Sequence, residues 1–176
     1  MLIEQSFTVG EACRASGVGE RTFQNWIRRG LIAAESDDMT GGGSPGRYRR
    51  LSGRVVMHLA IARALIDGGL GGNSPAAALD AAAGFAFHGI EDRLGKYIFK
   101  GRVPGMPFAE RTLFAVCGEK TAAVPDTDPG AARLICSTMK APLIVDATLV
   151  FAQVCGGLGA HPASELAAAY GEEVTQ

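Results

Sequence analysis

The sequence predicts an α+β protein in which a mostly helical N-terminal part is followed by a small unit of mixed strands and helices. Up to about residue 88, apolar residues recur at helical spacing behind capping residues. Beyond about residue 90, short runs rich in Val, Ile, Leu, Phe and Tyr alternate with Gly and Pro clusters, which is typical of strands. The 176 residues, 47% hydrophobic and 20% charged, provide enough apolar material for a buried core. We therefore expect two domains, over 1–88 and 89–176.

The first expected element is a helix over about 9–15. Thr8 followed three residues later by Glu11 forms a capping box, in which the hydroxyl and the carboxylate satisfy backbone amides at the start of the helix. Gly17 lies where a left-handed residue would end it.

A second helix is expected over about 19–29. Its i, i+3, i+4 spacing places Phe23, Trp26 and Ile27 on one side, and Gly30 provides the C-terminal stop. Two short helices joined by a turn that contains glycine are a candidate helix-turn-helix.

Residues 35–47 contain four glycines and one proline and are predicted to form an exposed, flexible hairpin loop with little to bury. Tyr48 and Leu51 are expected to return to the core. Ser52 can then cap a third helix over about 53–67.

A fourth helix is expected over 75–87, with Ser74 as its cap and Pro75 at its first position. The runs predicted as strands are 96–103, 112–117, 121–124 and 132–137. A tight turn over 118–120 would join two of them.

Residues 143–154 begin like a strand but also fit a helical face, so either a strand or a helix starting at Pro142 is possible. A last short helix is expected over 162–170. The 143–154 stretch is interrupted by Asp146 and is shorter than the roughly 20 residues of a membrane helix. We therefore expect a cytoplasmic protein with no membrane segment and no signal peptide.

In their order and spacing, four pieces of the first 70 residues resemble the MerR-type winged helix-turn-helix and, more distantly, the excisionase fold. The pieces are FTVGEACRASGV, GERTFQNWIRRGLI, the loop ending in YRRLS, and VVMHLAIARALIDGGL. The resemblance implies that the helix at 19–29 is a recognition helix and that the hairpin at about 35–50 is a wing. Family members typically have Arg-Tyr-Tyr where this chain has Gln24, Asn25 and Trp26, so their DNA site cannot be transferred. The long coiled-coil helix of the family is also missing here.

Double-stranded DNA is the partner that these residues favour. Gln and Asn can pair bidentately with adenine and Arg with guanine in the major groove, whereas wing arginines suit phosphates or an adjacent minor groove. The candidate DNA-binding residues are Arg21, Thr22, Gln24, Asn25, Arg28, Arg47, Tyr48, Arg49 and Arg50. Two of these arginines have structural alternatives: Arg28 could cap the end of its helix, and Arg50 could be an ion-pair partner.

The prediction is a sequence-specific transcription regulator of bacterial or phage type, with no enzymatic activity, metal or cofactor. Residues 89–176 would dimerise, sense a signal, or contact a second regulatory protein or RNA polymerase. The alternatives are an excisionase-like architectural protein and a protein–protein interaction module with a vestigial helix-turn-helix. His88, Glu91 and Asp92 have a spacing that could bind a metal but is more typical of a polar helix face. Three of the four cysteines, Cys117, Cys136 and Cys155, fall in apolar runs, where we expect inert thiols.

Overall fold

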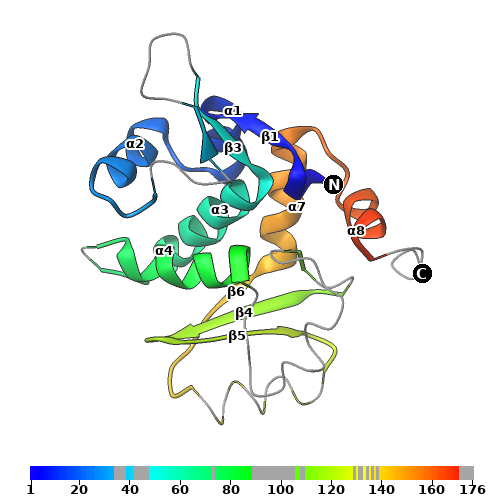
Figure 1. Cartoon of the computed structure of the whole chain (residues 1–176). Helices are drawn as coiled ribbons and strands as arrows, with labels where there is room; N and C mark the ends of the chain where they lie inside the picture. Colours follow the sequence, from blue (N-terminus) through cyan, green and yellow to red (C-terminus); the bar gives the residue numbers. More distant parts are fainter. Residues whose placement is uncertain are drawn as a thin grey trace.

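The protein is an α+β structure in which helices lie between two small antiparallel sheets (Figure 1). The computed structural model describes residues 1–33, 39–41, 48–72, 74–88, 106–107, 110–128, 130, 133, 135, 137 and 139–170. The elements are η1 (Leu2–Glu4), β1 (Ser6–Thr8), α1 (Val9–Ser16), α2 (Glu20–Arg28), β2 (Met39–Thr40), β3 (Arg50–Ser52), α3 (Gly53–Asp67), α4 (Ala76–Ala83), the π-helical turn η2 (Gly84–His88), β4 (Thr112–Cys117), β5 (Lys120–Pro125), β6 (Leu143–Asp146), α7 (Ala147–Leu158) and α8 (Pro162–Tyr170).

Helices α1 and α2 begin and end close to where the sequence predicts. The Glu11 amide donates to Thr8 Oγ1 at 3.3 Å, and the Thr8 amide donates to the Glu11 carboxylate at 2.8 Å, so the predicted capping box is confirmed. Gly17, at φ 72°, ends α1 in the left-handed conformation. Phe23 and Trp26 of α2 are buried.

The first sheet has the strand order β1-β3-β2, and its inner face closes the N-terminal core. Phe7, Leu51 and Met39 lie side by side across the three strands. Met39 is buried, so the prediction that residues 35–47 hold little to bury is wrong at this position. The loop residues 34–38 and 42–47 lie outside the described part of the chain.

The expected return of Tyr48 to the core is also wrong, because this side chain is 85% exposed. Side chains alternate between the two faces of an extended chain. Because Leu51 is buried, position 49 lies on the same inner side, two residues earlier. Positions 48 and 50 lie on the outer side. The aromatic ring of Tyr48 therefore faces solvent.

Helix α3 is the central helix of the structure. Ser52 Oγ accepts from the Val55 amide at 3.3 Å, which confirms the predicted cap. Gly53 allows the N-terminal segment to pass directly over the start of α3, since a Cβ there would lie 2.2 Å from the Leu2 carbonyl oxygen. Helix α4 starts at Ala76, as expected within a residue, and continues as the π-helical turn η2.

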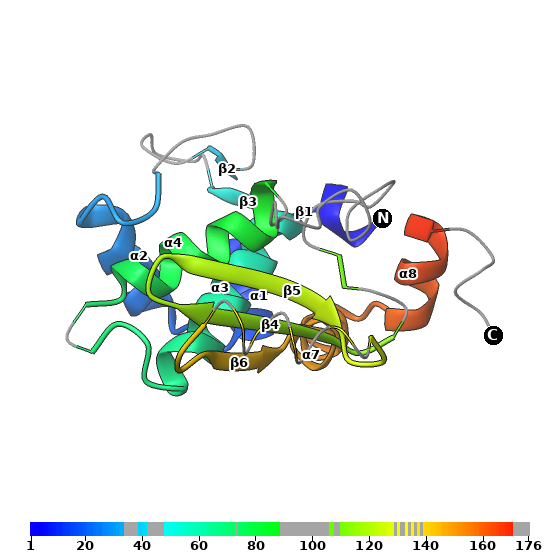
Figure 2. The same ribbon diagram turned by 90° about the horizontal axis from the view of Figure 1, so that it is seen from below.

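The second sheet has the order β5-β4-β6 and lies below the helices in Figure 1, so that it stands in front of them in the view from below (Figure 2). Gly118, at φ 62°, and Glu119 form the two-residue turn of the predicted β4–β5 hairpin. The stretch 143–154 contains both alternatives: strand β6 runs to Asp146, whose carboxylate then caps α7 by accepting from the Leu149 amide at 3.0 Å.

One predicted strand in the C-terminal half is wrong. Residues 133, 135 and 137 are helical, and the Met139 amide donates to the Ile135 carbonyl at 2.9 Å. Ile135 and Met139 are buried against the outer face of the second sheet, in one cluster with Ala115, Ala122 and Val124. The predicted strand at 96–103 lies outside the described residues.

The inner face of the second sheet belongs to the same core as the N-terminal helices. Phe114 and Val145 are buried in one cluster with residues of α1, α3, α4 and α7, and the Phe114 ring lies 5.2 Å from that of Phe85. The division at residue 88 into independently folding domains stays a prediction, and in the structure both parts contribute to one core. None of the helices in the described ranges is both long and apolar enough to cross a membrane.

Helix α7 packs against both α1 and α3. At its crossing with α1 the backbones come so close that a Cβ on Gly157 would lie 2.7 Å from Ala15 Cα. Gly156 and Gly157 lie in the last turn of α7, which ends at Leu158 with Gly159 as its C-cap. The close crossing is what requires glycine at position 157.

We predict opposite effects for the same substitution at these two adjacent glycines. Gly157→Ala should lower the free energy of unfolding by about 1–3 kcal/mol, because the added methyl overpacks against α1. Gly156 has no atom within 4 Å of a built Cβ, so Gly156→Ala should be neutral or stabilise by up to about 1 kcal/mol through helix propensity. Urea unfolding of both variants measures this, and equal effects would contradict the close crossing.

His58 provides a second test, of the α3–α4 contact. Its side chain is buried, Nε2 donates to the Leu79 carbonyl at 2.8 Å, and its ring meets Phe87 edge-on. Burial lowers the pKa of His58 below 6.5, against the smaller opposing effects of the Leu79 hydrogen bond and the Asp80 charge.

Because the folded state keeps His58 neutral, the unfolded state binds more protons as the pH falls below about 6.5. Stability should therefore decrease with falling pH in this window, until the lowered folded pKa is reached. His58→Gln keeps a hydrogen-bond donor for the Leu79 carbonyl but cannot titrate. Its melting temperature should therefore fall less between pH 7 and pH 5 than that of the unaltered protein. Identical slopes for the two proteins would contradict a buried neutral imidazole.

Candidate nucleic-acid interface

The outer side of α2 carries a row of polar and basic side chains. All five predicted residues of this helix are exposed, whereas Phe23 and Trp26 anchor its other side in the core. The five are Arg21, Thr22, Gln24, Asn25 and Arg28. Four of them, all except Gln24, line one shallow depression on the surface. The helical spacing thus brings the predicted residues together on one face.

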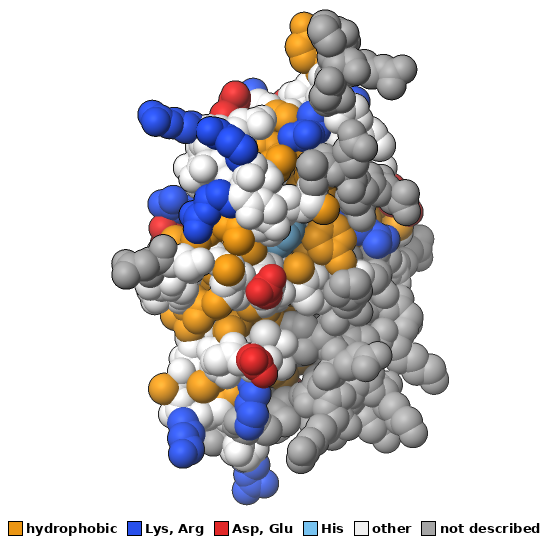
Figure 3. Space-filling model, turned by 60° about the vertical axis from the view of Figure 1, so that its left-hand side comes forward, with side chains coloured by type: hydrophobic (Ala, Val, Ile, Leu, Met, Phe, Trp, Pro, Cys, Tyr) orange, Lys and Arg blue, Asp and Glu red, His pale blue; other side chains and the backbone are white. Residues whose placement is uncertain are grey.

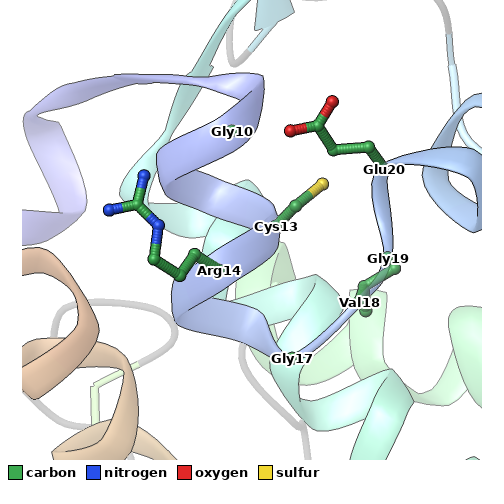
Figure 4. A pocket seen from close by; sticks show the side chains of 7 residues that line it. All are labelled: Gly10, Cys13, Arg14, Gly17, Val18, Gly19 and Glu20. Atoms are coloured by element: carbon green, nitrogen blue, oxygen red, sulfur yellow. The ribbon is translucent and has the colours of Figure 1, made fainter.

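The single acidic residue of α2 is turned away from this row. Figure 4 shows the Glu20 carboxylate directed toward the start of α1, and its Oε1 would lie 3.3 Å from a Cβ on Gly10. The outer face of α2 therefore keeps its positive charge. None of the ion pairs found among the described residues involves Arg21 or Arg28.

The predicted wing residues divide into different environments. Tyr48 is exposed, and Arg49 is half-buried with an Nε atom that has no hydrogen-bond partner in the described structure. Arg50 is exposed, but its Nε donates to Ser6 Oγ at 3.0 Å and its Nη2 donates to the Ser6 carbonyl oxygen. Arg47 lies outside the described residues.

Helix α2 and the first sheet lie at the same end of the molecule, opposite the second sheet (Figure 1). The space-filling view shows Lys and Arg side chains projecting from this end, above a middle region covered largely by apolar side chains (Figure 3). The geometry thus presents a basic helix and a short hairpin on one side of the protein.

A second depression between α1 and α2 contains a thiol and a carboxylate (Figure 4). Burial, and then the nearby Glu20 charge, raises the pKa of Cys13 to about 11, so the thiol is protonated near neutral pH. A protonated thiol is a poor nucleophile and metal ligand. This depression does not have the chemistry of a thiol-based active site.

Sequence reasoning did not predict a third depression, where α1, α3 and α7 meet. Arg14, Gln153 and the Arg63–Asp67 pair lie around a floor of alanines. Arg63 is exposed, as expected for a solvated face of α3, and its guanidinium is 2.8 Å from Asp67. Such a site depends on three helices distant in sequence, so no local pattern could indicate it.

The described residues contain no cluster of three or more side chains suited to hold a metal ion. The metal site that the spacing of His88, Glu91 and Asp92 could form is not tested by this observation. Glu91, Asp92 and the His88 side chain lie outside the described part of the chain.

Neither a protein-family model nor a curated protein matches this chain. The role of the exposed side chains is therefore argued from their own geometry and chemistry.

The cysteines allow a direct test of the site assignment. Burial, and then the Glu165 charge, raises the pKa of Cys155 to about 12, and Cys117 is half-buried. With Cys117 and Cys136 replaced by serine, Cys13 and Cys155 should not react with a disulfide reagent at pH 8 until denaturant is added. Rapid labelling of Cys13 in the folded protein would instead indicate an accessible, activated thiol between α1 and α2.

Proposed function

We propose that the protein is a sequence-specific, double-stranded DNA-binding regulator of transcription that reads the major groove with α2 and contacts the backbone or minor groove with its wing. The observation that carries the proposal is the two-sided character of α2, which buries Phe23 and Trp26 while exposing its polar and basic row. The order α1, glycine turn, α2 and hairpin is the arrangement that a winged helix-turn-helix requires.

The exposed groups of α2 match what the major groove offers. An α-helix fits this groove, where Arg can pair with guanine O6 and N7, and Asn or Gln with adenine N6 and N7. Because Arg21, Asn25 and Arg28 lie on one stripe of the helix, they can reach neighbouring base pairs and phosphates together. The buried aromatic residues hold the helix rigidly while it does so.

The wing complements this contact. Tyr48 is exposed, and the half-buried Arg49 lies next to it in the chain. Phosphate oxygens accept hydrogen bonds from Arg and Tyr side chains and fix the register of a protein on DNA. We assign Arg49 and Tyr48 to this role, with Arg47 as the remaining wing candidate.

The first experiment selects binding sequences from random duplexes and then titrates the best one at several salt concentrations. Arg21→Ala and Arg28→Ala should each weaken binding, and each lost phosphate contact should reduce the salt slope by about one. Gln24→Ala should instead reduce the sequence preference at one base pair, with a loss of about 1–3 kcal/mol in the discrimination between the preferred base pair and the others.

Arg63→Ala is the matched control, since it removes an exposed arginine from the side of α3 that faces α7. It should bind like the unaltered protein. Failure to select any sequence, or an equal loss in the control, would overturn the proposal. Genome-wide immunoprecipitation then separates promoters, as expected for a regulator, from the attachment sites of an architectural protein.

A further inference from the structure

We propose that Arg50 is a positioning residue that fastens the wing to the start of α1, and that it is not a DNA contact. The fastening is a property of the free protein. Its consequence for affinity depends on the proposed DNA binding.

The geometry starts from the register of the first sheet. Thr8, Arg50 and Thr40 lie side by side on its outer face, and Ser6 lies two residues before Thr8 on the same face of β1. From the central strand, the Arg50 side chain reaches diagonally to Ser6. Both the side-chain and the backbone oxygen of Ser6 accept hydrogen bonds from its guanidinium, at Nε and Nη2 respectively.

This contact connects two elements with few other connections. Strands β1 and β3 have three residues each and β2 has two, so the backbone ladder of the sheet is short. β1 leads directly into the capping box of α1, and β2 is held only through β3 among the described strands. Besides this ladder and the buried side chains of Leu51 and Met39, the two hydrogen bonds from Arg50 add polar contacts that join the wing to the start of α1.

The charge of Arg50 also acts on a nearby carboxylate in the free protein. The Glu11 carboxylate accepts from the Thr8 amide and hydroxyl, which lower its pKa most, and the Arg50 charge lowers it further. A guanidinium that already donates to two fixed acceptors on Ser6 would have to give up these hydrogen bonds to bind a phosphate. Arg49, one residue earlier, has a buried Nε with no such acceptor in the described structure.

The test compares Arg50→Ala, Arg50→Lys and Ser6→Ala, with Arg49→Ala as the matched control. In the DNA-free protein, amide hydrogen exchange of Met39, Thr40 and Leu51 should accelerate by about fivefold for each hydrogen bond lost. Arg50→Lys keeps the charge but cannot reproduce the two-pronged contact, so it should behave like Arg50→Ala. Ser6→Ala should give an intermediate rate, and Arg49→Ala should match the unaltered protein.

In DNA titrations, Arg50→Ala, Arg50→Lys and Ser6→Ala should weaken binding without changing the salt slope, whereas Arg49→Ala should reduce the slope by about one. One result would overturn the proposal. In it, Arg50→Lys and Ser6→Ala would show the DNA affinity and the amide exchange rates of the unaltered protein, whereas Arg50→Ala would lower both the affinity and the salt slope. Arg50 would then be a phosphate contact. If no DNA is bound at all, the proposed function fails, and the exchange rates still decide whether Arg50 fastens the wing.

Discussion

Helix α3 is apolar on nearly every side, and the need to cover all of it organises the structure. Ten of its fifteen residues are buried, including every residue from Val55 to Ala62. Burying apolar side chains is the main favourable contribution to folding, so a helix without a polar face must be surrounded. Its neighbours are η1, β3, α1, α4, α7 and an edge of the second sheet. These elements come from both halves of the chain, which explains why the halves share one core.

The same requirement determines which parts of the protein are free to contact a partner. Helix α2 is not among the main neighbours of α3 and is held through Phe23 and Trp26, beside α1. Its remaining surface is therefore available, and it carries arginines and amides. The first sheet uses its inner face for the core and leaves Tyr48 and Arg50 outside. This basic helix and the short hairpin at one end of the protein are the features on which the proposed DNA binding rests.

The C-terminal half supports this surface from behind. Helix α7 crosses α1 at Gly157 and Ala15, and the Glu165 carboxylate of α8 accepts a hydrogen bond from the Leu2 amide, next to the start of the first sheet. The N-terminal turn that leads into the first sheet is thus tied to α8, which lies near it in Figure 2. Assembly or signal sensing by residues 89–176 would act on the helix-turn-helix through these contacts.

The sequence by itself determined the α+β class and most element boundaries, because these depend on groups a few residues apart. The Thr8–Glu11 capping box, the Ser52 cap and the Gly118 turn each satisfy backbone groups locally. It also determined the exposed row of α2, since the spacing of Phe23 and Trp26 fixes which side is buried.

Tertiary structure decided what depends on residues distant along the chain. Met39 is buried because it lies beside Leu51 across the sheet, and residues 133, 135 and 137 are helical where Ile135 and Met139 cover a face of the second sheet. Gly157 must be glycine because α1 passes within contact of it, and Arg50 bonds Ser6 across two strands. These contacts join residues of different helices and strands. Which residues meet is set by the packing of the whole chain, and no local pattern in the sequence indicates it.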